Sequence, residues 1–332
     1  MSGILLVGCG KMGSALVGGW LSEGRDPASI TIIEPQLSSL APLVARGVRA
    51  LVADQDLPGT FAPELVLFAV KPQVMDDVIP PYARFKESAV YMSIAAGRTL
   101  AFFKECLGED AAIVRVMPNT PAAIGRGISG GVASDTVQKN QLDLAASLMR
   151  AAGEFHWLTS ESQIDAVTAV SGSGPAYIFL LAECLAEAAV SLGLPDELAE
   201  RLGRMTVAGS GELLHQSKET AAILRQNVTS PGGTTEAALK VLMADAGLQA
   251  LLNEAAEAAA EEEEEARSEL ERGEGVRWSV LVVSYAGREE VERGEGGETC
   301  LWGSARLLRR LLRGQLLLPR SHGPDERGDS LF

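Results

Sequence analysis

The sequence predicts an α/β Rossmann-type dinucleotide-binding domain followed by an all-α dimerisation domain. Three observations lead to this prediction. A glycine-rich motif follows the first apolar run, short apolar runs alternate with helical patterns over the first half, and helical periodicity dominates the second half. A length of 332 residues is typical of two domains. We expect domains at 1–158 and 159–270, with residues 271–332 as an atypical, poorly ordered C-terminal extension.

Composition narrows the class of protein. A net charge of −15 argues against a nucleic-acid partner, because nucleic acid selects basic surfaces. The four cysteines are isolated from one another and the three histidines are scattered, so we expect no disulfide framework and no metal site. No basic segment precedes an apolar run at the N-terminus, so we expect no signal peptide and a cytoplasmic location.

The first apolar run, residues 4–7, predicts a buried parallel strand. It leads into the motif Gly8-Cys-Gly-Lys-Met-Gly13, and a helical pattern follows from residue 14 to about 23. Gly8 allows the tight turn, Gly10 lets the backbone approach a pyrophosphate, and Gly13 lets the helix pack on the strand. The order strand, motif, helix therefore predicts a dinucleotide site here.

A second strand is expected at residues 30–33, and it ends at Glu34. This acid lies about 20 residues after Gly13, where a Rossmann fold places the group that meets the adenosine ribose. The alternative is a solvated residue at the end of a strand. A carboxylate facing the ribose would repel the 2′-phosphate of NADPH, and no Arg or Lys lies between residues 30 and 44. We therefore expect NADH to be used at least as well as NADPH.

Three further strands are expected at residues 65–69, 89–93 and 112–116. Each ends in small or turn-forming residues, and such loops gather at the carboxyl edge of a parallel sheet, where these folds bind ligands. Lys71 begins one of these loops. It could be a catalytic lysine, but shaping the nicotinamide pocket or solvating the loop is favoured.

The helix expected at residues 176–192 is apolar on most of its circumference. Its two carboxylates, Glu183 and Glu187, favour a buried helix over a membrane span. A helical half of this size is too small to cover such a helix alone, so we expect a symmetric dimer. The stretch 171–175 predicts the helix start, with Pro175 at the first helical position. Other helices are expected at 196–216, from 235 and from about 247.

The stretch Asn227-Val-Thr-Ser-Pro-Gly-Gly-Thr-Thr-Glu-Ala-Ala-Leu239 predicts a tight loop that opens a helix. It carries four hydroxyls, and Thr234 or Thr235 is expected to cap the helix. A helix start with hydroxyls and free N–H groups suits a small carboxylate. The alternative is a capped loop with no ligand.

The five glutamates at 261–265 predict a solvated face or the frayed side of the last helix.

Six motifs occur in order along the chain: VGCGKMG at 7–13, AVKPQ at 69–73, SIAAG at 93–97, RVMPNTP at 115–121, IDAVTAVSGSGPAY at 164–177 and NVTSPGGTTEAAL at 227–239. Together they resemble pyrroline-5-carboxylate reductases over residues 1–270. The last two are highly specific. Residues 271–332 lie beyond the resemblance.

The resemblance implies reduction of 1-pyrroline-5-carboxylate to L-proline with NADP(H) or NAD(H), the last step of proline synthesis. It implies a homodimer of interlocked helical domains, possibly assembled into a decamer. The residues expected along the cofactor are Val7, Gly8, Cys9, Gly10, Lys11, Met12, Gly13, Glu34, Val70, Lys71, Pro72, Ala96, Gly97 and Asn227. The substrate is expected to meet Glu161 and the loop residues Thr229, Ser230, Gly232, Gly233, Thr234 and Thr235, the loop being contributed to the partner's site. Thr235 is the expected catalytic residue, with its hydroxyl at the imine nitrogen.

Two other functions are weighed against this one. A β-hydroxyacid dehydrogenase would use a lysine on the helix between the domains, but no lysine lies between residues 139 and 218. A non-catalytic dinucleotide-binding protein, acting as a sensor or scaffold, would not need the hydroxyl-rich loop.

Overall fold

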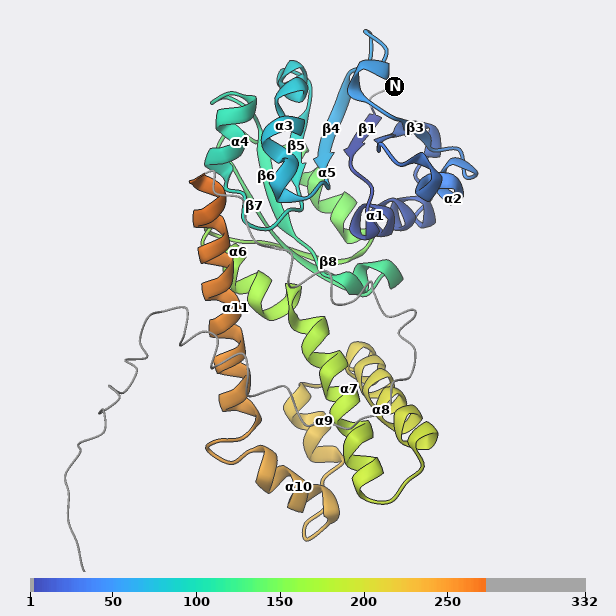
Figure 1. Cartoon of the computed structure of the whole chain (residues 1–332), viewed down its shortest axis with the longest axis vertical. Helices are drawn as coiled ribbons and strands as arrows, with labels where there is room; N and C mark the ends of the chain where they lie inside the picture. Colours follow the sequence, from blue (N-terminus) through green and yellow to red (C-terminus); the bar gives the residue numbers. More distant parts are fainter. Residues whose placement is uncertain (1–2, 273–332) are drawn as a thin grey trace, which may run out of the picture. The chain divides into compact units, whose positions relative to one another are not determined.

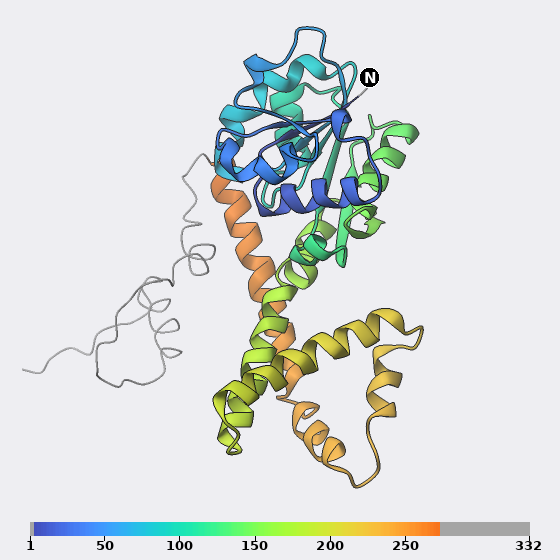
Figure 2. The same ribbon diagram turned by 90° about the vertical axis from the view of Figure 1, so that its right-hand side faces the viewer.

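An eight-stranded sheet with helices on both faces is followed by a region built of helices alone (Figure 1, Figure 2). The computed structural model describes residues 3–272, so the predicted extension lies outside the described residues apart from its first two. The predicted fold class is confirmed. The strands are β1 (Gly3–Val7), β2 (Ile30–Ile33), β3 (Arg49–Leu51), β4 (Pro63–Phe68), β5 (Val90–Ser93), β6 (Ile113–Met117), β7 (Gly127–Ala133) and β8 (Gly153–Trp157). The helices among them are α1 (Lys11–Ser22), α2 (Ala41–Val44), α3 (Met75–Val78), α4 (Leu100–Leu107) and α5 (Lys139–Arg150).

The sheet has the order β3-β2-β1-β4-β5-β6-β7-β8, and every neighbouring pair is parallel except β6 with β7. The five predicted strands are present, although α1 begins at Lys11 rather than at residue 14. The strands β3, β7 and β8 were not predicted. In β7 the sequence GISGGVA hides the strand, because glycine weakens strand propensity. Its glycines leave room for other side chains: a Cβ at Gly131 would lie 2.7 Å from the Phe155 ring.

Alternate residues of β1 enter two separate cores, one on each face of the sheet. Ile4 and Leu6 join the core that contains Trp20 of α1, whose indole N–H donates to the Leu148 carbonyl of α5 at 2.8 Å. Leu5 and Val7 join the core on the opposite face, with α3 and α4. Because both faces are covered, β1 is buried along its whole length, which fixes the position of the loop that follows it.

The second half begins with a continuous helical path, in which an α-helix begins at Gly174, within the stretch 171–175 where a helix start is predicted. Its helices are α6 (Gln163–Val167), a π-helical segment (Thr168–Gly172), α7 (Gly174–Ser191), α8 (Asp196–Gln216), α9 (Ala221–Asn227), α10 (Thr234–Leu242) and α11 (Leu248–Glu271). The predicted start is confirmed, although Pro175 is at the second helical position rather than the first. Before it the chain widens to a π turn, with the Ser173 N–H donating to the Thr168 carbonyl at 2.8 Å. The change of bonding pattern comes just before Pro175, which has no N–H to donate. The predicted boundary at 158 falls between β8 and α6 and stays a prediction.

No residue of α7 is buried within the chain. α8 packs against one side of it closely enough that a Cβ at Gly203 would meet the Ala182 carbonyl. The remaining apolar surface is open, with Phe179 54% and Leu181 42% exposed. The run Gln163–Ser191 is long and apolar enough to cross a membrane by length and composition alone, which is weak evidence by itself.

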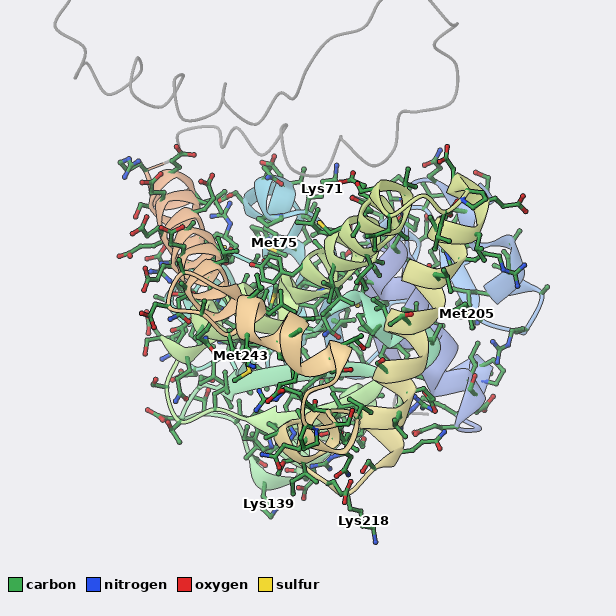
Figure 3. All side chains as sticks on the ribbon, turned by 90° about the horizontal axis from the view of Figure 1, so that it is seen from below. Lys71, Met75, Lys139, Met205, Lys218 and Met243 are labelled. Carbon is green, nitrogen blue, oxygen red and sulfur yellow. The ribbon has the colours of Figure 1, made fainter. Side chains whose placement is uncertain are left out.

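The last helix, α11, returns from the neighbourhood of α10 to that of α4 (Figure 1, Figure 2). Its second half lies against α6 and the loop between β5 and α4, while α9 and α10 lie at the other end of α11. Figure 3 shows Met205 of α8 and Met243, which follows α10, at the surface of this region; both are more than half exposed.

Candidate functional site

The glycine motif forms a tight loop between β1 and α1, at the carboxyl edge of the sheet. Gly8 has φ +80°, and a Cβ there would lie 2.5 Å from Val70 Cγ1, so only glycine fits between the two strands. A Cβ at Gly10, by contrast, would meet nothing within 4 Å, so this point of the loop faces open space. α1 has no side-chain cap at Gly10 and no acidic residue in its first turn. The helix start is thus open to a phosphate.

Glu34 lies directly across this loop, where the sequence predicts it. One carboxylate oxygen accepts from the Cys9 N–H at 2.9 Å, and the other accepts from the Gln36 N–H at 3.1 Å. Cys9 is buried beside Ser14, and burial raises the pKa of its thiol. The half-buried Glu34 carboxylate is therefore held against the loop, and this arrangement fits a dinucleotide with its ribose at the end of β2.

The loops after β4 and β5 meet beside the glycine loop. Val70 touches Gly8, as described, and Lys71 is exposed. The Pro72 carbonyl accepts two hydrogen bonds from the Arg98 guanidinium, at 3.0 and 3.2 Å. Arg98 also pairs with Asp76. The structure thus brings together the expected cofactor residues of both loops, with Ala96 half-buried and Gly97 buried.

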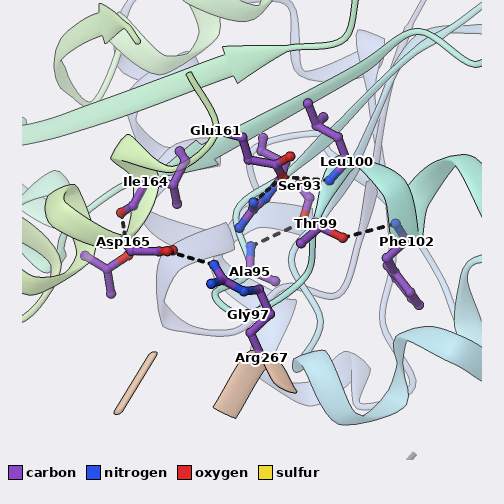
Figure 4. Close-up of polar contacts among 12 residues, drawn as sticks. Ser93, Ala95, Gly97, Thr99, Leu100, Phe102, Glu161, Ile164, Asp165 and Arg267 are labelled. Carbon is purple, nitrogen blue, oxygen red and sulfur yellow. Dashed lines mark hydrogen bonds and ion pairs between the residues drawn. The ribbon is translucent and has the colours of Figure 1, made fainter. Parts of the chain in front are cut away.

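Glu161 is engaged within the chain. Its carboxylate accepts from the Leu100 N–H at 2.7 Å and pairs with Arg115 (Figure 4). The Arg115 side chain is only 3% exposed. Glu161 therefore pairs with a buried arginine near the start of α4 while its own side chain is 32% exposed, and its predicted contact with substrate stays a prediction.

The glutamate run at 261–265 is not uniformly solvated, so that prediction is wrong for Glu263. Glu263 is 4% exposed and accepts from the Gly97 N–H at 2.8 Å, whereas its four neighbours in the run are exposed. Burial raises the pKa of this carboxyl. The prediction failed because helical spacing turns one glutamate of the run toward the sheet, which the run itself does not reveal.

A cavity of about 500 Å³ lies between the loop after β6 and the helices α7 and α11. Asn119, Ser171 and Tyr177 bring polar groups to a lining that is otherwise largely apolar. The Asn119 side chain accepts from the Ile128 N–H at 3.0 Å, and the Tyr177 hydroxyl donates to the Ala169 carbonyl at 3.1 Å. These three residues were not among the predicted site residues, although all three stand in the quoted motifs. Membership of those motifs was the signal that could have found them.

The hydroxyl-rich loop lies between α9 and α10, and its residues are mostly exposed. Gly232 adopts φ +73°, and its N–H donates to the Glu236 carboxylate at 2.8 Å. The helix begins at Thr234 with Gly233 as its N-cap and no side-chain cap bond. The predicted cap by Thr234 or Thr235 is therefore wrong, because both threonines already lie inside the helix.

The hydroxyls of this loop differ in their partners. The Thr229 hydroxyl donates to the Arg225 carbonyl at 2.6 Å, and Asn227 donates to Glu219 at 3.1 Å. Within residues 3–272, the hydroxyls of Ser230, Thr234 and Thr235 have no hydrogen-bond partner, and no hydrogen bond joins this loop to the glycine loop. Among the same residues, no cluster of three metal-ligating side chains is found.

Family models match both halves of the chain. Residues 161–266 match the model described as pyrroline-5-carboxylate reductase dimerisation. Residues 3–97 match the model described as NADP oxidoreductase, coenzyme F420-dependent.

Curated and solved relatives agree with these matches. The chain is 39% identical over 269 residues to pyrroline-5-carboxylate reductase of Pseudomonas aeruginosa, covering 80% of this chain and 97% of that protein. The structure of a pyrroline-5-carboxylate reductase from Coxiella burnetii is 38% identical and superimposes with a TM-score of 0.74, covering 80% of this chain and 98% of that one. The structure of Plasmodium falciparum pyrroline carboxylate reductase, solved with NADP bound, is 28% identical with a TM-score of 0.67. The match covers 79% of this chain and 97% of that one. The chain therefore belongs to the pyrroline-5-carboxylate reductase family.

Proposed function

We propose that the chain reduces the C5=N bond of 1-pyrroline-5-carboxylate to give L-proline, the last step of proline synthesis, with NADH or NADPH as the reductant. One observation carries the proposal. The chain joins an open glycine loop on a Rossmann sheet to an exposed hydroxyl loop within its family's dimerisation region. Both parts are needed for this reaction, since one holds a dinucleotide and the other suits a small carboxylate.

The dinucleotide would lie along the carboxyl edge of the sheet. The residues proposed to hold it are Val7 to Gly13, Glu34, Val70 to Pro72, Ala96 and Gly97, with Asn227 nearby from the helical region. When bound, the nicotinamide supplies the hydride. The protein aligns its ring against the substrate carbon, and Ala96 and Gly97 sit on a loop that is fixed from both sides.

The substrate would be held by the hydroxyl loop of the partner subunit. The N–H groups of Thr234 and Thr235 lie in the first turn of α10, where no intrahelical acceptor exists, so they can bind the substrate carboxylate. Thr229, Ser230, Gly232 and Gly233 shape the loop around them. Glu161 remains a proposed substrate contact from the sheet side.

The substrate enters as an iminium, whose protonated nitrogen makes C5 electrophilic. The protein then needs no strong general acid, and it must position the carboxylate and provide a hydrogen-bond partner at nitrogen. We assign that contact to the hydroxyl of Thr235, which has no partner among the described residues. Thr235 is thus the proposed catalytic residue.

Assembly follows from the open apolar surface of α7 and α8. A homodimer that buries this surface explains why so apolar a helix is exposed in one chain, without a membrane. We propose such a dimer, possibly assembled further into a decamer, in the cytoplasm and without a nucleic-acid partner. The negative charge supports the last point.

The test is an assay of the purified chain with reduced nicotinamide dinucleotide and pyrroline-5-carboxylate. Loss of the reduced-nicotinamide absorbance, with L-proline formed in equal amount, is the expected result. Dinucleotide binding without turnover would favour the sensor or scaffold. Oxidation of a β-hydroxyacid with the oxidised dinucleotide, without reduction of the imine by the reduced form, would favour the dehydrogenase.

A further inference from the structure

Glu263 differs from its neighbours on α11 in where its side chain lies. It is buried, as is Ala266, and these two residues together with Leu270 form one stripe at helical spacing. The stripe faces the loop between β5 and α4. Leu270 Cδ1 would lie 3.1 Å from a Cβ at Gly97, so the helix and the loop are in close packing.

That loop is held by hydrogen bonds to its backbone from several directions. The Ser93 hydroxyl accepts from the Ala95 N–H at 3.2 Å, and Thr99 caps α4 (Figure 4). Two carboxylates from the part of the chain after residue 158 also accept hydrogen bonds from this loop. Glu161 accepts from the Leu100 N–H, and Glu263 accepts from the Gly97 N–H. Gly97 adopts φ +75°, so its amide is turned to a direction that few residues other than glycine allow.

The surroundings of Glu263 contain three other charges. Arg115 lies on β6, Asp165 on α6, and Arg267 on α11 itself, where Arg267 pairs with Asp165 at 2.7 Å. Burying a carboxylate is unfavourable unless it is hydrogen-bonded or paired. Glu263 therefore occupies an unfavourable position that is offset by its bond to Gly97 and by the two nearby guanidinium groups.

We propose that Glu263 is a positioning residue, which holds Gly97 and Ala96 where the nicotinamide end of the dinucleotide binds. This assignment rests on the proposed function, because it takes the β5–α4 loop as part of the cofactor site. Glu263 lies on α11, the last helix of the helical half. Its carboxylate fixes the loop between β5 and α4, which belongs to the sheet half. Without the carboxylate, the Gly97 amide loses its acceptor in a buried place and the loop shifts to find another.

The test compares three substitutions on α11. Glu263→Ala removes the acceptor, Glu263→Gln keeps a carbonyl acceptor without the charge, and Glu264→Ala is the matched control at an exposed neighbour. Binding of NADH and NADPH is measured by fluorescence titration, and KM for the dinucleotide is compared with KM for the substrate. Glu263→Leu serves if the alanine variant does not fold.

We expect Glu263→Ala to weaken dinucleotide binding by about tenfold or more, the effect of an unsatisfied buried donor. KM for pyrroline-5-carboxylate should change far less. Glu263→Gln should bind within about threefold of the parent, because it keeps the acceptor for Gly97. Glu264→Ala should match the parent.

Dinucleotide binding by Glu263→Ala equal to that of Glu264→Ala would overturn the proposal. Loss of binding in Glu263→Gln as large as in Glu263→Ala would also overturn it, because the acceptor would then not be the cause. The proposed function is judged separately, by the turnover of the parent. A parent that binds dinucleotide but does not reduce the imine would refute that function and leave the binding comparison intact.

Discussion

The two halves of the described chain treat their apolar residues in opposite ways. All five residues of β1 are buried, whereas no residue of α7 is, although α7 is strongly apolar. Met75 in the sheet half is fully buried, while Met205 and Met243 in the helical half are 61% and 59% exposed. The sheet half completes two cores within one chain, and the helical half does not complete one.

This difference separates two tasks. A sheet covered on both faces fixes the glycine loop, and the neighbouring β5–α4 loop is also held by Glu161 and Glu263 of the same chain. The helical half keeps its apolar surface for a partner, and its hydroxyl loop is exposed at a distance from the sheet. The comparison predicts that substitutions at the glycine loop act within one chain, while those on the open apolar surface of α7 act on assembly.

The largest effect is expected for a charge on α7. Leu181→Asp would place an unpaired carboxylate in the dimer interface, which should weaken dimerisation by roughly a hundredfold to a thousandfold and abolish activity at ordinary concentration. Val52→Asp is the matched control, because Val52 is 49% exposed in the sheet half. Light scattering and turnover give the answer. A Leu181→Asp protein that remains dimeric would place the interface elsewhere.

The next effect concerns Thr235. Thr235→Ala should lower kcat by about tenfold to a hundredfold, the range for one lost hydrogen bond to the reacting group. Dinucleotide affinity should hardly change, since the Thr235 hydroxyl is assigned to the substrate nitrogen and not to the dinucleotide. Thr60→Ala, at an exposed threonine of the sheet half, is the control. Normal turnover by Thr235→Ala would assign the contact at nitrogen to another group, such as water.

Glu34, in the sheet half, is expected to set the preference between NADH and NADPH. Glu34→Ser removes the carboxylate that lies on the Cys9 N–H, and with it the repulsion of a 2′-phosphate. The ratio of kcat/KM for NADPH to that for NADH should rise by roughly tenfold or more. The parent should use NADH at least as well as NADPH. A parent strongly selective for NADPH, or an unchanged ratio, would show that Glu34 does not face the ribose.

The smallest effect is on stability and its dependence on pH. Burial raises the pKa of Glu263 above the ordinary value of 4.5, so the folded state binds this proton more tightly than the unfolded state. The free energy of unfolding therefore falls as pH rises from 4.5 through the raised pKa. Glu263→Gln should have a higher Tm than the parent at neutral pH, with the difference shrinking toward acid. A Tm difference between Glu263→Gln and the parent that is the same at all pH values would show that the Glu263 charge does not contribute to the difference.

Much of the sheet half was predictable because its signals are local. A largely apolar run of β-branched residues fixes β2 at residues 30–33, and the glycine motif fixes the turn after β1. β7 escaped prediction because its glycines make room for Val167 and Phe155, and those contacts are not written in its own sequence.

Less of the site in the helical half could be predicted from the sequence. The π turn at 168–172 was not predicted, because a proline in a Gly/Ser stretch predicts only the helix start that follows it. Glu263 cannot be told from the other glutamates of its run, since only the position of Gly97 distinguishes it. The hydroxyl loop was located from its motif, yet its cap was wrong because the helix begins one residue too early for either threonine to serve.

The most direct test of the division between the halves combines two impaired variants in one preparation. Gly10→Asp places a negative charge where the pyrophosphate binds, at a point where a Cβ meets nothing within 4 Å, so the fold should survive. Thr235→Ala disables the hydroxyl loop. Mixed dimers should contain one site built from two intact halves, so the reassembled mixture should regain about a quarter of the parent's activity, well above either variant alone. Activity no higher than the average of the two separate variants would contradict the account, because each chain would then use its own loop.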